Sequence, residues 1–223
     1  MLKAPTLHSL RRSRFLALLL SLVLLLLVSP FLEQSRTHEA VMVVLFAVVM
    51  LAAIVAASGR RRSVIIGLAF GIPWLVLSLS GFIWRNADPT IGANLLFIAF
   101  NVYTLGIILT AVVGAAEVDF DILLGAVSAY LLLAIIWAVS YSVIYTLSPG
   151  AFSLVTEMAR PHLHQFMYFS LTTLTTLGYG DITPISPFAR IWSTLEAVVG
   201  TLYIAVLVAR LVGMYQSQHP KRR

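Results

Sequence analysis

The chain has 223 residues, of which 60% are hydrophobic and 11% are charged, and its mean hydropathy is +0.95. This composition indicates an integral membrane protein, and the absence of cysteine excludes disulfides, thiolate metal sites and thiol nucleophiles. The net charge of +6 does not indicate a nucleic-acid partner, because the basic residues stand at the ends of apolar runs and not on a basic patch.

The first half of the chain contains four apolar runs. The first, residues 15–32, follows a basic start and fits either a short membrane span or a signal peptide. Residues 28–30 read Val-Ser-Pro and offer no clear small-x-small cleavage site, so we favour a retained helix. The next runs predict spans over 40–57, 64–84 and 91–116. We therefore expect residues 1–116 to form a peripheral four-helix membrane bundle.

The fourth run, 91–116, carries no charged residue. A voltage-sensing helix needs several arginines or lysines, because each full charge moved through the membrane potential supplies about 2.3 kcal/mol per 100 mV. The predicted bundle resembles a voltage sensor in the number and order of its spans, but it lacks the charges.

The second half begins with an acidic linker, residues 117–121, which we expect in the cytoplasm. A fifth span is predicted over 122–147, then a short helix from Phe166 that cannot cross a membrane, and a last span over 189–215. Residues 122–215 thus form one module, followed by a short basic cytoplasmic tail, 216–223. We expect no ligand-binding domain in a tail of this length.

The stretch from Thr172 to Asp181 reads Thr-Thr-Leu-Thr-Thr-Leu-Gly-Tyr-Gly-Asp. A cation that crosses a membrane must exchange its water for several weakly binding oxygens, and backbone carbonyls can supply them. Turning successive carbonyls toward one axis requires left-handed backbone, which glycine adopts at little cost, so Gly178 and Gly180 fit this task. Irregular backbone at membrane depth is tolerated only where protein or a water-filled path surrounds it. The alternative is an ordinary turn between two helices.

The segment Thr176-Leu177-Gly178-Tyr179-Gly180, within the pattern T-x-T-T-x-G-Y-G-D, resembles the selectivity filter of potassium channels. This resemblance implies an all-α membrane protein with six transmembrane helices per subunit, a re-entrant pore helix and a filter loop, assembled as a homotetramer. It implies that Thr176 to Gly180 bind K⁺, that Leu177 and Tyr179 point away from the axis, and that the protein is not an enzyme and needs no cofactor.

Four residues are expected to support the filter: Thr172, Thr175, Asp181 and Glu196. Several similar channels carry a glutamate in the pore helix that pairs with the filter aspartate, but this sequence has Thr172 in that place. Glu196 is the only acidic residue inside a span, so it is expected to have a partner. We hypothesise that it reaches behind the filter to pore-helix threonines such as Thr172. A ring of carboxylates facing the water-filled cavity is the alternative.

The family also carries a hinge glycine nineteen residues beyond the filter aspartate, and that position is Gly200. The resemblance implies that Gly200 is a gating hinge, because glycine eases the bending of a helix. Close packing of a neighbouring helix against a small residue is the alternative. His162 and His164 lie near Glu157 in the expected outer loop, where a solvated loop is favoured over a metal or proton site.

Positive charges predict the orientation. Placing both termini in the cytoplasm puts eleven of the fifteen basic residues inside, and leaves Arg36, Arg85, Arg160 and Arg190 outside. The filter then opens outward. We therefore expect a multi-pass protein of the cell membrane, with membrane lipids, K⁺ and its own copies as partners, and with an unseen regulatory subunit left open.

The resulting hypothesis is a passive potassium channel that is insensitive or weakly sensitive to voltage. A non-selective cation channel on the same pore is the nearest alternative, since Leu177 replaces the commoner valine. A potassium transporter is disfavoured because its filters are degenerate and repeated four times in one chain. An intramembrane enzyme is disfavoured because the spans contain no serine–histidine or carboxylate–histidine set.

Overall fold

The computed structural model describes residues 14–32, 37–57, 61–83, 90–115, 117, 119–154 and 163–218. Within these ranges the chain is helical except for one short two-stranded ribbon and the connecting loops, which confirms the all-α prediction apart from the ribbon. The helices are α2 (Arg14–Val28), η1 (Ser29–Leu32), α3 (Thr37–Ala57), α4 (Arg61–Ile83), α5 (Thr90–Gly114), α6 (Phe120–Leu147), α7 (Leu163–Leu174) and α8 (Pro187–Gln218).

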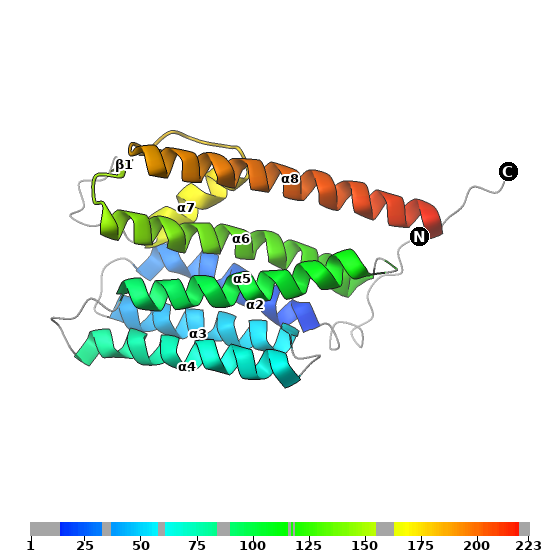
Figure 1. Ribbon diagram of the computed structural model, residues 1–223, viewed down its shortest axis with the longest axis horizontal. Helices are drawn as coiled ribbons and strands as arrows, with labels where there is room; N and C mark the ends of the chain where they lie inside the picture. The colour runs from blue at the N-terminus through cyan, green and yellow to red at the C-terminus, as the bar shows by residue number, and fades with distance from the viewer. Residues whose placement is uncertain are drawn as a thin grey trace.

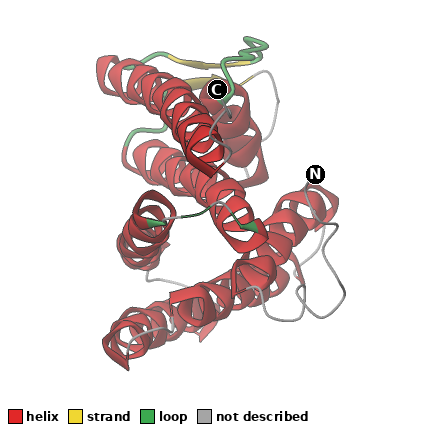
Figure 2. Ribbon diagram, turned by 90° about the vertical axis from the view of Figure 1, so that its right-hand side faces the viewer, coloured by secondary structure: helices red, strands yellow, loops and turns green. Residues whose placement is uncertain are grey.

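The long helices lie roughly side by side, with α8 at one edge and α4 at the other (Figure 1). Helix α7 is short and lies obliquely between α6 and α8 (Figure 1). In the view turned by 90° the layers separate, and α8 lies at the far side of α6 from the bundle of α2 to α5 (Figure 2). Both α2 and α5 pack against α6, so the bundle is attached to the module of residues 122–215 along two helices.

The bundle is held by apolar packing between its own helices. Rings of Phe46, Trp74 and Phe97 cluster among α3, α4 and α5, with the centroids of Phe46 and Phe97 4.5 Å apart. Trp74 is buried, and it follows Pro73, which lies within the continuous helix α4.

Three helical segments within the described residues are long and apolar enough to cross a membrane: Ile91–Gly114, Phe120–Leu147 and Pro187–Arg210. Three shorter apolar segments lie in α2 and η1, in α3 and in α4. The positions of all six match the predicted runs to within a few residues. The number of six spans stays a prediction, because only three segments meet the length and composition expected of a span.

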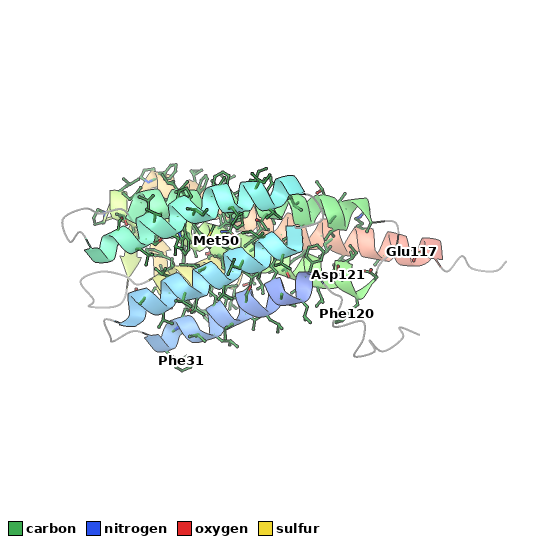
Figure 3. All side chains as sticks on the ribbon, turned by 90° about the horizontal axis from the view of Figure 1, so that it is seen from below. Phe31, Met50, Glu117, Phe120 and Asp121 are labelled. Atoms are coloured by element: carbon green, nitrogen blue, oxygen red, sulfur yellow. The ribbon has the colours of Figure 1, made fainter. Side chains whose placement is uncertain are left out.

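The acidic residues before and within the first turn of α6 connect helix ends. Asp119 is the N-cap of α6, and its carboxylate accepts a hydrogen bond of 2.8 Å from the N–H of Ile122. Asp121 lies in the first turn of α6 and accepts from the N–H of Phe15 at 3.2 Å. Asp121 and Phe120 lie beside the start of α2, at the opposite end of the molecule from Phe31 (Figure 3). A carboxylate is therefore placed where the positive ends of two helix dipoles meet.

The ribbon was not predicted. Strand β1 (Phe152–Leu154) pairs antiparallel with β2 (Ile182–Pro184), and Ser153 lies opposite Thr183. Next to the ribbon, the N–H of Ile185 donates to the carbonyl of Ala151 at 2.8 Å. The ribbon thus joins the segment after α6 to the segment before α8.

Candidate functional site

The candidate site is the segment between α7 and β2, residues 175–181, which we call the filter loop. Helix α7 has 12 residues and is about 18 Å long, so it is too short to cross a membrane. At the other end of the filter loop the chain continues directly into the ribbon. Both ends of the loop are thus held by regular structure.

The backbone of the filter loop alternates in handedness. Thr176, Gly178 and Gly180 have φ values of +61°, +51° and +81°, and among the described residues no others have positive φ. The two glycines adopt the left-handed region as predicted. Thr176 was not predicted to do so, because this conformation costs a residue with a side chain about 1–2 kcal/mol and is rare for a β-branched one. Left-handed residues at every second position are the backbone pattern expected of a row of aligned carbonyls.

The last turn of α7 holds the start of the filter loop. The carbonyl of Thr172 accepts from the N–H groups of Leu177 at 2.8 Å and Gly178 at 3.1 Å, and the carbonyl of Thr173 accepts from the N–H of Thr176 at 3.0 Å. The hydroxyl of Thr175 donates to the carbonyl of Leu171 at 2.6 Å. These bonds satisfy carbonyls that a helix end otherwise leaves without partners. Thr172 therefore contacts the loop through its backbone.

The far end of the filter loop contains Asp181. One carboxylate oxygen accepts from the hydroxyl of Tyr168 at 2.7 Å and the other from the N–H of Ile182 at 3.0 Å. Tyr168 also stacks on Tyr179, with centroids 6.2 Å apart and rings nearly parallel. The hydrogen bond to Asp181 is the main cause that raises the pKa of Tyr168 to about 12. The sequence showed that Thr172 stands where several similar channels carry an acidic partner of the filter aspartate. It did not identify Tyr168, which lies one turn earlier on α7 and contacts Asp181.

Leu177 and Tyr179 are exposed on the single chain, with 56% and 68% of their surface accessible. In addition, only 17% of the apolar stretch within Pro187–Arg210 of α8 is buried, whereas 67% of the corresponding stretch of α6 is buried. Large apolar side chains of the filter loop and of α8 are therefore uncovered on this one chain.

Glu196 of α8 is fully buried behind α7. The hydroxyl of Tyr141 on α6 donates to its Oε2 at 2.5 Å, and a hydrogen bond joins Ser170 on α7 to its Oε1. The carboxyl group therefore joins three helices, and burial by its own chain argues against the cavity-ring alternative. The predicted contact of Glu196 with Thr172 is wrong, because the Thr172 hydroxyl donates to the carbonyl of Phe169 at 3.0 Å. That hydroxyl was already satisfied within its own helix. The pore-helix partner of Glu196 is Ser170.

Gly200 lies where α8 closely approaches the end of α7. A Cβ atom placed on Gly200 would lie 2.3 Å from the carbonyl oxygen of Leu174, the last residue of α7. The same carbonyl accepts from the hydroxyl of Tyr130 at 3.2 Å. Helix α8 continues through Gly200 without interruption. This contact supports the close-packing alternative, while the role of Gly200 as a gating hinge stays a prediction.

Arg210 connects α8 to the bundle. Its guanidinium donates to the carbonyl of Val113, and to that of Ala115 at 3.3 Å, at the C-terminal end of α5. A cation at this end of a helix satisfies unpaired carbonyls and complements the helix dipole. From the sequence alone, Arg210 was counted only among the positive charges that predict the orientation.

The histidine group expected in the outer loop lies mostly outside the described residues: His162 and Glu157 are not described, and His164 lies in the first turn of α7. Among the described residues no group of three or more histidine, cysteine or acidic side chains is arranged to hold a metal ion.

Residues 129–217, which include α7, the filter loop and nearly all of α8, match the family model described as "Ion channel". Over these residues the chain is similar to ion channels, and its relatives include several potassium channels. It is 34% identical over 68 residues to two pore potassium channel c of Oryza sativa subsp. japonica, covering 30% of this chain and 15% of the relative. Ion channels are not enzymes, which agrees with the prediction of a non-enzymatic protein.

Two further relatives extend the comparison. The chain is 34% identical over 95 residues to the inward rectifier potassium channel Kirbac3.1 of Paramagnetospirillum magnetotacticum, covering 38% of this chain and 32% of the relative. It is 39% identical over 49 residues to the potassium voltage-gated channel protein shk-1 of Caenorhabditis elegans, covering 22% and 9%. The matches thus span at most about a third of these relatives.

Proposed function

We propose that this chain is the subunit of a potassium-selective channel that conducts passively. The observation that carries the proposal is the left-handed backbone at Thr176, Gly178 and Gly180, in a segment that matches the ion channel family. A potassium ion leaving water needs several oxygens in place of its hydration shell. Carbonyls of residues 176–180 and the hydroxyl of Thr176 would supply these oxygens, with Asp181 at the mouth.

The functional unit in this proposal is a homotetramer, because one chain supplies one filter strand and four are needed around the axis. The low burial of α8 and the exposure of Leu177 and Tyr179 support this, since neighbouring copies would cover them. Chemical cross-linking and mass measurement in detergent test the assembly. A monomer or dimer as the conducting species would contradict it.

We further propose that all six apolar segments cross the cell membrane, with both termini in the cytoplasm and the filter opening outward. The positive charges favour this orientation. Labelling of single introduced cysteines by an impermeant reagent tests it directly, because the natural chain contains no cysteine.

Voltage sensitivity is expected to be absent or weak, because residues 91–116 carry no charge. Recording the open probability over a range of about 100 mV tests this, since each moved gating charge would contribute about 2.3 kcal/mol over that range. A steep change of open probability with voltage would contradict it.

The deciding experiment is ion flux in liposomes that contain the purified protein, under potassium and sodium gradients. Selective flux of potassium is expected, and Gly178→Ala serves as the matched control because it alters the filter backbone alone. Equal permeability to both ions would overturn selectivity in favour of the non-selective cation channel. Absence of passive flux under any gradient would favour the transporter.

A further inference from the structure

Behind the filter loop, three short oxygen–oxygen contacts meet at one place. The Tyr141 hydroxyl lies 2.5 Å from Oε2 of Glu196, Ser170 Oγ contacts Oε1 of Glu196, and the same Ser170 Oγ lies 2.7 Å from the carbonyl oxygen of Ala134. All of these residues have at most 1% of their surface accessible.

Each of these three contacts needs a proton between its two oxygens. Tyr141 and Ser170 have one hydroxyl proton each, and the Ala134 carbonyl can only accept. The Tyr141 proton satisfies the contact with Oε2, and the Ser170 proton satisfies the carbonyl of Ala134. The contact between Ser170 Oγ and Oε1 then lacks a proton, unless the carboxyl group of Glu196 supplies it. The geometry is complete when Glu196 is protonated and donates to Ser170.

The surroundings favour the same state. Tyr141 packs against the rings of Trp137, Phe152 and Phe169, so the carboxyl group lies beside an apolar cluster. An ionised carboxylate in such a place requires a basic partner. The two arginines of α8 bond elsewhere: Arg190 donates to the carbonyl of Pro184 and Arg210 to that of Val113.

We propose that Glu196 is a neutral carboxylic acid which, with Tyr141 and Ser170, positions the pore helix α7 behind the filter. We call these three residues the Glu196 bracket. In this arrangement the hydroxyl of Tyr141 donates to Glu196, the carboxylic acid of Glu196 donates to Ser170, and the hydroxyl of Ser170 donates to the carbonyl of Ala134.

The bracket is placed to act on the filter through α7. Ser170 lies two residues before Thr172, whose carbonyl holds the N–H groups of Leu177 and Gly178. A shift of Ser170 therefore moves the carbonyl that fixes the start of the filter loop. This role rests on the proposed function, whereas the protonation state does not.

Infrared spectroscopy of the full chain in lipid vesicles tests the protonation state without any ion current. The difference spectrum between wild type and Glu196→Gln should contain, at neutral pH, the carbonyl stretch of a protonated carboxylic acid that belongs to Glu196. Tyr141→Phe, which removes one hydrogen bond to that carbonyl, should shift the band. A difference spectrum showing only carboxylate bands for Glu196 would overturn the proposal, even in a protein that conducts potassium normally.

Substitution tests the positioning role. Glutamine keeps both contacts of the neutral acid, because its NH₂ can donate to Ser170 and its oxygen can accept from Tyr141. We expect Glu196→Gln to keep the potassium-to-sodium permeability ratio within about twofold of wild type. Glu196→Ala and Ser170→Ala leave buried polar groups unpaired and should change the ratio, or the rate of inactivation, by roughly tenfold.

Two substitutions serve as matched controls. Tyr203→Phe removes another hydroxyl that joins α8 to α6, through the carbonyl of Ala126 at 2.6 Å, and Ser128→Ala removes a buried serine hydroxyl that bonds only within α6. Both should leave permeability and inactivation near wild type. Equal damage by Glu196→Gln and Glu196→Ala, or no effect of Glu196→Ala and Ser170→Ala, would overturn the positioning role.

Discussion

Replacing Gly200 by alanine separates two roles of this residue, a gating hinge and a close packing position. An added Cβ would lie 2.3 Å from the carbonyl oxygen of Leu174, where ordinary contact begins at 3.4 Å, so α7 and α8 must separate by about 1 Å. The atom it meets belongs to the backbone and cannot rotate away. Overpacking of this kind costs about 1–3 kcal/mol, and the better helix propensity of alanine returns at most about 1 kcal/mol.

This displacement acts at the end of α7, directly before the filter loop, and it also affects the hydrogen bond from Tyr130 to Leu174. We therefore expect Gly200→Ala to lower the thermal stability of the assembled protein and to change the potassium-to-sodium permeability ratio. Gly213→Ala is the matched control, because Gly213 lies on the same helix and has no heavy atom within 4 Å of its added Cβ.

The measurements are thermal unfolding in detergent and permeability in planar bilayers, each with both variants. If Gly200→Ala keeps the stability and permeability ratio of the wild type and changes only the open probability, the packing argument is refuted and the hinge is supported. If the variant matches the wild type in every measurement, both roles are wrong.

The remaining predictions concern the filter and the connection to the bundle. Gly178→Ala meets no neighbouring atom, so its penalty of about 1–2 kcal/mol per subunit is purely conformational, and we expect assembly without potassium flux. A conducting Gly178→Ala channel would contradict the role of left-handed backbone. Tyr168→Phe keeps the ring but removes the donor to Asp181, and we expect conduction to decline faster during sustained opening; an unchanged time course in bilayer recordings would exclude this role. Arg210→Met removes the cation that contacts the carbonyl of Val113, which costs about 1 kcal/mol of interaction free energy. This loss should shift the ratio of open to closed channels by up to roughly fivefold, and Arg210→Lys should have an intermediate effect. Identical open probabilities in all three proteins would show that this contact does not affect gating.

The filter was the most predictable part of the site, because its chemistry is carried by the backbone of consecutive residues. The need for left-handed dihedrals assigns Gly178 and Gly180 from sequence alone. The same reasoning missed Thr176, since a β-branched residue in this region is explained only by the hydrogen bonds that the end of α7 provides. Local propensity cannot foresee a strained residue that surrounding structure holds in place.

The surroundings of Glu196 were predictable only in kind. A lone carboxyl group in an apolar span must have a partner, which correctly directs attention to the pore helix. The partners themselves, Tyr141 and Ser170, are 55 and 26 residues away in sequence and meet Glu196 only because α6, α7 and α8 cross at one place. The contact of Arg210 with α5 was missed for the same reason. The two strands of the ribbon were missed because they are too short to produce a periodic pattern in the sequence.

Most side-chain contacts of the filter loop on this chain are made with α7, through Thr175, Tyr179 and Asp181, and Leu177 and Tyr179 are otherwise largely exposed. The shape of the loop therefore depends on where α7 stands. That position is set by contacts outside the motif: the carboxyl of Glu196 on α8, the hydroxyl of Tyr130 on α6, and the bare backbone of Gly200 against Leu174. Two channels with the same filter residues can consequently differ in the stability of the conducting filter, and the cause should be sought on the two helices that flank the pore helix.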